Sequence, residues 1–343
     1  MAQTVDPKLA ESWSFVQQAM PNVPYSLLEG ACREGQVMIY HGTWADAQDA
    51  QIAGFLKRFP CVKVSKFSST MGELRERFVS EARANRDVAD IMQDSDTGSF
   101  DVEDKQGMLM HYTISNDKEL PDAAKHSGLW YSLRVALVGV AWNTDLVSDA
   151  DAAILSEWKG LIDPRWNNRG VVVSPEGGVA FLPWFAWDTL YGEDFLKKIG
   201  ALHPRVAHGI NNAAASLASG DVSVIFNASE TGLLPLYLKG APIRWSLPSP
   251  GVGPLTGEAI PARAPHPNAA KLYHEYAFTT EGYSLFQKLG GAPTRLGVKD
   301  QRKVAGESWY KIPATLWAYD PAAATAANDR IVGEFSRDVA QGK

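Results

Sequence analysis

Short apolar, β-branched runs alternate with longer amphipathic segments from Val37 onward. The short runs have the length of strands, and the segments between them carry apolar residues at helical spacing. The predicted strands are 37–40, 62–67, 89–92, 135–142, 171–173 and 222–227. The predicted helices are 45–58, 71–84, 178–191, 193–200, 212–219, 230–239, 267–277 and 280–289. Strands separated by helices of this length indicate right-handed βαβ crossovers and parallel sheets, so the predicted fold class is α/β.

Composition narrows the class of protein. A length of 343 residues predicts two domains, since one domain usually takes roughly 100 to 200 residues. The net charge is −6, and Lys and Arg are scattered along the chain, which argues against a nucleic-acid partner. No apolar stretch approaches the ~18 residues that span a bilayer; the longest, 135–142, has the length of a strand.

The first predicted strand is followed by a turn with ligand-binding chemistry. In open α/β sheets, ligands lie beyond the carboxyl ends of the strands, where helix N-termini direct free N–H groups. The turn contains His41, Gly42, Thr43 and Trp44. Glycine permits close backbone approach, threonine offers a hydroxyl, and histidine can carry part of a positive charge. A structural histidine with internal partners is the alternative interpretation of His41.

The turns after the second and third strands are also polar. Ser69 and Thr70 place hydroxyls at a helix start, either toward a ligand or as N-caps in a capping box with Glu73. Asp94 and Ser95 follow the third strand, with a second acid directly after them. Such a pair of acids suits a metal ion or an ammonium group, or caps the next helix.

Several segments recur in the order and at the spacing of one known family. The most specific is 158–170, WKGLIDPRWNNRG, which is followed by an apolar run and the turn SPEGG. The others are 27–35, 37–40, 55–60, 62–67, 72–74, 89–91, 138–145, 266–272 and 280–282. Together they resemble the bacterial extracytoplasmic solute-binding proteins of the ferric-iron-binding class. Those proteins are the capture subunits of ABC importers.

The resemblance implies a type-II periplasmic binding protein fold. In that fold two α/β lobes, each a mainly parallel sheet flanked by helices, are joined by a two-strand hinge. Lobe one is expected to comprise 1–137 and 260–343, and lobe two 138–259. The implied function is capture of a small solute in the inter-lobe cleft by hinge closure, without chemistry and without a cofactor. The implied partners are an ABC permease and its ATPase, and the protein is expected to be a monomer.

Further ligand-binding candidates follow from matches to the family's contact positions. Arg134 matches a cleft arginine whose guanidinium suits a carboxylate or phosphate, with a surface salt bridge as the alternative. The turn Gly177-Gly178 has two glycines in a row, and the exposed backbone N–H groups of such a turn favour an anion. Asn211 and Asn212 of lobe two either contact the ligand or cap the next helix. The lobe-two candidates are Glu176, Gly177, Gly178, Asn211, Asn212, Asn227 and Glu230.

The sequence departs from the ferric-binding pattern after the strand that ends at Phe226. Ferric-binding members place two adjacent tyrosines there, whereas this chain has Asn227-Ala228-Ser229-Glu230-Thr231, and Tyr237 lies too deep in the next helix. A small polar, anionic organic solute is therefore the expected ligand. A ferric or other metal ion, and a ligand-sensing module for a signalling receptor, are the alternatives within the same fold.

An enzyme is the main alternative outside the family. The chain contains no HExxH, GxSxG, GK[ST] phosphate loop or CxxC motif, and its seven histidines are dispersed. The sequence leaves open one kind of enzyme, a metal-dependent one whose site is assembled from residues far apart in the chain. We expect no catalytic residues.

The two cysteines and the N-terminus bear on location. Cys32 and Cys61 precede the first two strands, which begin at the same edge of a parallel sheet. A disulfide between them would suit an oxidising periplasm, and two buried free thiols are the alternative. The first residues lack the features of a signal peptide, but 2–4 would suit a mature N-terminus left by cleavage. We expect a periplasmic protein whose signal peptide has been removed.

Overall fold

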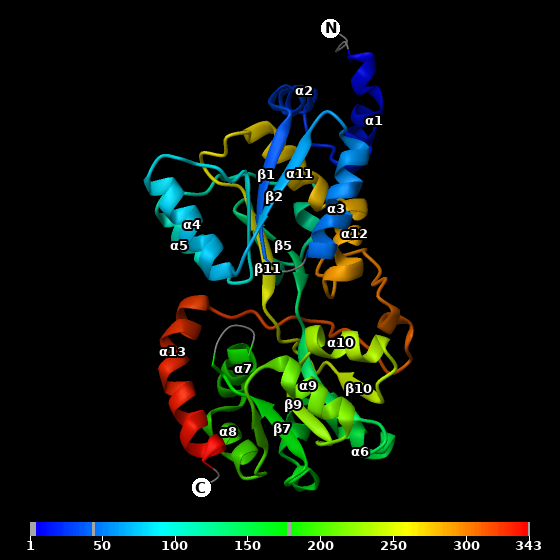
Figure 1. The fold of residues 1–343 in the computed structure, drawn as a ribbon, viewed down its shortest axis with the longest axis vertical. Helices are drawn as coiled ribbons and strands as arrows, with labels where there is room; N and C mark the ends of the chain where they lie inside the picture. The colour runs from blue at the N-terminus through cyan, green and yellow to red at the C-terminus, as the bar shows by residue number, and fades with distance from the viewer. Residues whose placement is uncertain (1–4, 43–44, 177–179, 342–343) are drawn as a thin grey trace. The chain divides into compact units, whose positions relative to one another are not determined.

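The computed structural model describes residues 5–42, 45–176 and 180–341. The chain forms two compact units (Figure 1). Unit 1 consists of Met1–Val135 and Leu255–Gln301, and unit 2 consists of Ala136–Pro254 and Arg302–Lys343. The chain therefore passes between the units three times, whereas the sequence predicted a two-strand hinge. The segment from Arg302 onward belongs to unit 2, although the sequence placed it in lobe one.

Unit 1 contains a six-stranded sheet in the order β2-β1-β3-β11-β5-β4. β1 pairs in parallel with β2 and β3, whereas β11 is antiparallel to β3 and β5. β11 begins at the edge where β3 and β5 end and so runs the opposite way. The sheet is therefore mixed, where the sequence predicted mainly parallel pairing. The strands are β1 (Gln36–His41), β2 (Lys63–Ser68), β3 (Ile91–Asp94), β4 (Lys125–His126), β5 (Trp130–Val135) and β11 (Leu255–Ala259).

Helices cover both faces of this sheet, with α3 and α12 on one side and α4 and α5 on the other (Figure 1). Strand residues alternate between the two faces. Val37 and Ile39 join the core with α3 and α12, whereas Tyr40 packs in the core with α4 and α5. The helices are α1 (Ala10–Ala19), α2 (Tyr25–Glu34), α3 (Ala45–Arg58), α4 (Met71–Arg83), α5 (Gly98–Lys105), α11 (Pro267–Ala277) and α12 (Thr280–Gly290).

A disulfide joins Cys32 on α2 to Cys61 just before β2, with their Cα atoms 5.1 Å apart. Gly35 ends α2 with φ of 69°, a left-handed conformation that favours glycine. The Gly35 carbonyl accepts a hydrogen bond from the Lys63 amide at 2.9 Å. The disulfide and this backbone bond therefore hold together the starts of β1 and β2.

Unit 2 contains a five-stranded sheet in the order β10-β6-β9-β7-β8. β7 is parallel to β8 and β9, and the β6–β9 and β10–β6 pairs are antiparallel. The predicted strand 135–142 is two strands in the structure, because β5 ends at Val135 and β6 begins at Val138 in the other unit. The strands are β6 (Val138–Asn143), β7 (Gly170–Val173), β8 (Arg205–Ala207), β9 (Val224–Ser229) and β10 (Ile243–Ser246).

The helices of unit 2 surround a tryptophan-rich core. Trp158, Trp166, Trp184 and Trp187 are at most 1% exposed in one apolar cluster. The helices are α6 (Asp149–Ala152), α7 (Phe181–Tyr191), α8 (Glu193–Gly200), α9 (Ile210–Ser219), α10 (Glu230–Leu238) and α13 (Pro321–Glu334). In the described part of the chain, no helix has the length and apolar character needed to cross a membrane.

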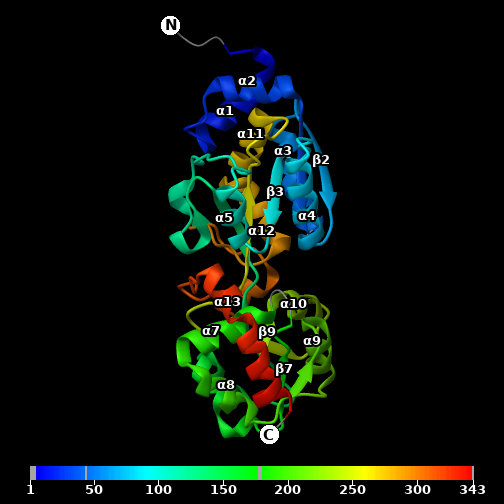
Figure 2. The ribbon, with the colours of Figure 1, turned by 90° about the vertical axis from the view of Figure 1, so that its left-hand side faces the viewer.

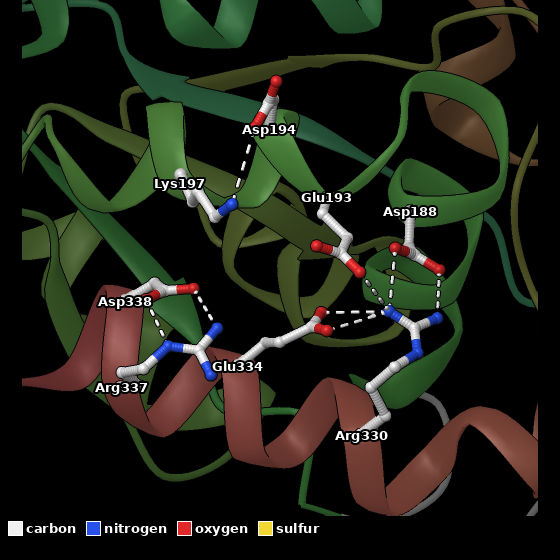
Figure 3. A network of polar contacts seen from close by, with 8 residues as sticks. All are labelled: Asp188, Glu193, Asp194, Lys197, Arg330, Glu334, Arg337 and Asp338. Atoms are coloured by element: carbon white, nitrogen blue, oxygen red, sulfur yellow. Dashed lines mark hydrogen bonds and ion pairs between the residues drawn. The ribbon is translucent and has the colours of Figure 1, made fainter.

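Helix α13 packs beside α7 (Figure 2), and its π-helical continuation over Phe335–Ala340 packs beside α8. Arg330 donates to Asp188 at 2.6 Å and to Glu334 at 3.0 and 3.1 Å, and lies 3.9 Å from Glu193 (Figure 3). The Phe335 ring packs edge-on against Trp184 with centroids 4.9 Å apart. The C-terminal segment thus completes the core of unit 2, which explains why it does not belong to unit 1.

Candidate functional site

The carboxyl edge of the unit 1 sheet brings several predicted residues into one region. His41 ends β1 and Asp94 ends β3. The neighbouring strand β11 pairs Thr256 with Arg134 and Gly257 with Asp94. Because β1, β3 and β5 run the same way, their last residues lie along one edge. His41, Asp94 and Arg134 therefore lie along the same edge of the unit 1 sheet.

His41 is fully buried, and neither ring nitrogen has a hydrogen-bond partner. Burial lowers the pKa of His41 and the positive charge of Lys66 lowers it further, whereas the interaction with the Gly42 backbone and the negative charge of Asp49 oppose that shift. The imidazole is therefore neutral at neutral pH. The Gly42 carbonyl accepts from the Ser68 hydroxyl at 3.0 Å, and the predicted Thr43 and Trp44 lie outside the described residues.

Ser69 and Thr70 form the capping box that was the alternative to ligand binding. The Thr70 hydroxyl accepts from the Glu73 amide at 3.4 Å, and the Glu73 carboxylate accepts from the Thr70 amide at 3.4 Å. Glu73 also accepts from the Ser69 hydroxyl. These hydrogen bonds lower the pKa of Glu73. Both hydroxyls therefore take part in starting α4.

Asp94 is fully buried and is held by Arg75 of α4 at 2.7 and 3.1 Å. It also accepts from the Ser99 hydroxyl at 3.2 Å and the Asp96 amide at 2.8 Å. Burial raises the pKa of Asp94, and the Arg75 charge opposes that shift. Ser95 is half-buried. The Asp94 carboxylate therefore fixes the turn between β3 and α5.

Glu103 on α5 is an acid that the sequence reasoning missed. It is 3% exposed, and neither carboxylate oxygen has a hydrogen-bond partner. Burial, followed by the negative charge of Asp94, raises the pKa of Glu103 to about 7. No motif signals this residue, because an acid in the second turn of a short helix is ordinary.

Arg134 is 2% exposed, and its Nε donates to the Thr256 hydroxyl at 3.1 Å. The surface salt bridge that was its alternative role does not apply to a residue this buried. Gly291 allows the close approach, since a Cβ there would lie 3.2 Å from Arg134 Cδ. Arg134 is thus a buried guanidinium at the end of β5.

In unit 2, a pocket of about 380 Å³ lies at the carboxyl ends of β7 and β8. The carboxylate of Glu176 lies 3.8 Å from the His208 ring, and both side chains are exposed. Gly177 and Gly178, predicted with Glu176, lie outside the described residues. Sequence reasoning missed His208, although its place directly after a strand is the available signal. The lining residues are Val173, Ser174, Glu176, Ala180, His208, Gly209 and Ile210.

The N-terminus of α9 opens beside this pocket. Gly209 precedes the helix with φ of 107°, and no side chain caps the first N–H groups. Asn211 is exposed, and the Asn212 amide donates to the His208 carbonyl at 3.1 Å. Neither asparagine is the N-cap that was one interpretation of the pair. The uncapped N–H groups carry the positive end of the helix dipole.

Asn227 and Glu230 make internal contacts in unit 2. The Asn227 amide accepts from the Val173 N–H at 2.7 Å and donates to the Val173 carbonyl at 2.9 Å. The Glu230 carboxylate is bound by Trp245, Tyr310 and Arg302 at 3.0, 2.7 and 3.2 Å. These side chains therefore hold β9 to β7, and α10 to the C-terminal segment.

Comparison with known proteins identifies the fold. No protein-family model matches the sequence, and no curated protein matches it. Among solved structures, the chain is similar to a putative extracellular solute-binding protein from Bordetella parapertussis, with a TM-score of 0.74 and 12% identity over 89% of this chain and 99% of that one. It is also similar to iron-bound HitA from Pseudomonas aeruginosa, with a TM-score of 0.68 and 19% identity over 86% and 99%.

A third similar structure is the periplasmic binding protein AfuA from Actinobacillus pleuropneumoniae with fructose-6-phosphate bound, with a TM-score of 0.60 and 21% identity over 89% and 98%. These likenesses cover nearly the whole of each solved chain. The protein therefore has the type-II periplasmic binding protein fold, as the sequence resemblance predicted. At 12%, 19% and 21% sequence identity, these likenesses show the fold alone.

Proposed function

We propose that this protein is the solute-binding subunit of an ABC importer and captures a small polar, anionic organic solute. The observation that carries the proposal is the fold, which is shared over at least 86% of this chain with several solute-binding proteins. One similar structure is the substrate-binding protein of an ABC transporter from Agrobacterium tumefaciens. The partners would be a permease and an ATPase, and the location would be extracytoplasmic.

Two features of the described residues support an anionic solute. The first is the buried guanidinium of Arg134, because such a group suits a carboxylate or phosphate. The second is the uncapped N-terminus of α9 beside the unit 2 pocket, whose N–H groups suit an anion. The Glu176 carboxylate lines the same pocket, so a solute there would need a donor or cationic group beside its anionic one.

A metal ion is the second candidate, since HitA is iron-bound and a related ferric-binding protein comes from Campylobacter jejuni. This chain lacks the tyrosine pair after β9, and Asn227 binds the backbone of Val173 there instead. Within the described ranges, no group of three His, Cys, Asp or Glu side chains is placed to hold a metal. These observations favour an organic solute over a ferric ion. A sensor module for a receptor would use the same binding chemistry.

A thermal-shift screen tests the proposal. The panel contains carboxylates, phosphonates, sugar phosphates, polyamines and ferric salts. A solute at 100-fold its dissociation constant adds about 2.7 kcal/mol to the free energy of unfolding, which raises the melting temperature by several degrees. We expect at least one organic anion to do so, with binding confirmed by calorimetry. A response to ferric salts alone, or turnover of a bound compound, would contradict the proposal.

A further inference from the structure

Two neighbouring side chains in unit 1 leave buried polar atoms without partners. The atoms are Oε1 of Gln93 and both ring nitrogens of His41. Both residues are fully buried. Buried polar atoms in native proteins nearly always have a hydrogen-bond partner, so a group of three that lacks one indicates that something else supplies it.

The orientation of the Gln93 amide is fixed by a relay of hydrogen bonds that begins at the backbone. The Nε2 of Gln51 donates to the carbonyls of Ala277 and Gly282 at 3.4 and 3.1 Å, so its Oε1 is the acceptor. That oxygen accepts from the Tyr273 hydroxyl at 2.9 Å. The same hydroxyl therefore accepts from Nε2 of Gln48, at 2.6 Å. Gln48 is left with its Oε1 as an acceptor.

Gln93 completes the relay. Its Nε2 donates to the Oε1 of Gln48 at 2.8 Å and to the Oε2 of Glu258 at 2.9 Å. Turning the amide over would place its oxygen against two acceptors, so the nitrogen must occupy this position. Gln93 Oε1 is consequently an acceptor whose donor is absent.

His41 lies beside Gln93 on the sheet. Tyr40 pairs with Met92, and His41 and Gln93 are the next residues on the two parallel strands. Alternation along the strands puts both side chains on the face of α3. The two charges that act on the His41 ring, Lys66 and Asp49, pair with each other. A neutral imidazole then offers one N–H donor and one acceptor next to the Gln93 acceptor.

We infer that His41 and Gln93 form a neutral subsite that recognises a hydroxyl group of the solute. The hydroxyl donates to Gln93 Oε1 and accepts from the ring N–H of His41. The inference rests on the proposed function and narrows the solute to hydroxyl-bearing anions, such as polyol or sugar derivatives. Since both side chains are fully buried, binding includes a local rearrangement that uncovers them. A bare metal ion would find no anionic ligand in this pair.

Two matched compounds test the inference on the full chain. Glycerol 3-phosphate and n-propyl phosphate share an anionic group and a three-carbon skeleton, but only the first carries hydroxyls. We expect calorimetry to show at least about tenfold tighter binding of glycerol 3-phosphate, which is the scale of one hydrogen bond whose partner would otherwise stay unpaired. In ¹⁵N NMR spectra, glycerol 3-phosphate should shift the His41 ring resonances and n-propyl phosphate should leave them unchanged.

A pair of variants makes the same change at opposite ends of the sheet. Gln93→Leu removes the proposed acceptor, and Gln36→Leu alters an exposed glutamine at the start of β1. The Gln93 variant should bind both phosphates equally, whereas the Gln36 variant should keep the preference. If the Gln93 variant does not fold, the wild-type affinities and the His41 resonances decide the question.

The outcomes separate this inference from the proposed function. Equal wild-type affinities for the two phosphates, or His41 resonances that do not respond to glycerol 3-phosphate, would overturn the inference and leave solute binding intact. Failure of both phosphates to bind would also overturn it. In that case the proposed function stands if another organic anion of the thermal-shift panel binds, and falls if none does.

Discussion

Arg330 on α13 holds Asp188 on α7 with two hydrogen bonds, of 3.2 Å from Nη1 and 2.6 Å from Nη2 (Figure 3). Glu334, one turn further along α13, binds the same guanidinium. The pairing raises the pKa of Arg330, with the Asp188 hydrogen bond as the largest cause. A single guanidinium thus joins α13 to a residue of α7 that lies 142 positions earlier in the chain.

Arg330→Ala should lower the free energy of unfolding of unit 2 by about 1 kcal/mol. The value is small because the Arg330 side chain is 43% exposed and solvent screens its charge. Arg337→Ala is the matched control, since the hydrogen bonds of the Arg337 guanidinium go to its chain neighbour Asp338. Urea unfolding measures both variants. Equal effects would contradict the role of Arg330 in holding α13.

Glu103 should make the protein less stable as pH rises from about 4.5 to above 7. The folded state keeps the proton on Glu103, because burial raises its pKa to about 7, whereas the unfolded state releases it near 4.5. The folded state therefore binds more protons in this window, and the stabilisation is fully present below it. The loss reaches about 3 kcal/mol as an upper bound, at about 1.4 kcal/mol per pH unit.

Glu103→Gln should remove that pH dependence. The variant should melt at a higher temperature than the wild type at pH 8.5 and at a similar temperature at pH 5. Glu76→Gln, which alters an exposed acid on α4, is the control and should follow the wild type. Parallel melting curves of the Glu103 variant and the wild type across this range would refute the assignment.

Removal of the Cys32–Cys61 disulfide should destabilise unit 1 by about 2 to 4 kcal/mol. The bond closes a loop between residues 29 positions apart, and opening it gives the unfolded chain more conformational entropy. Denaturant unfolding of the double serine variant, and of the wild type with reductant, measures the loss. Alkylation of both cysteines in the denatured protein without reductant would show that the bond is absent.

Arg134→Ala should weaken binding of an organic anion by about 1.5 to 3 kcal/mol, the scale of a lost charged hydrogen bond. The matched control is Arg295→Ala, which removes another buried arginine of unit 1, one that donates to the Phe278 carbonyl at 3.0 Å. Calorimetry with the anion found in the screen measures both. Unchanged affinity in the Arg134 variant would remove that residue from the site.

Periodicity predicted the long amphipathic elements of the fold well. Helices 45–58, 193–200 and 267–277 have the predicted bounds, because each is flanked by polar or turn-forming residues. The strands β4, β8, β10 and β11 were not predicted. Each has five residues or fewer, which is too short for alternation to stand out. The antiparallel position of β11 depends on where the chain returns to unit 1, which local pattern does not encode.

The candidate site was predicted only as far as strand ends can be located. One edge of a sheet does hold His41, Asp94 and Arg134, because each of them is the last or the next-to-last residue of its strand. Hydrogen-bond partners could not be predicted in the same way. The internal contacts of Asn227 and the relay behind Gln93 join residues far apart in the sequence, and only the folded chain brings them together.

The return of residues from Arg302 onward to unit 2 affects the order in which the protein can form during synthesis. Helix α13 leaves the ribosome after every residue of unit 1, so the tryptophan-rich core stays incomplete until the segment after Gln301 has been made. A stop codon anywhere after Gln301 would keep every residue of unit 1 but would truncate unit 2. Neither half can be obtained by cutting the gene once.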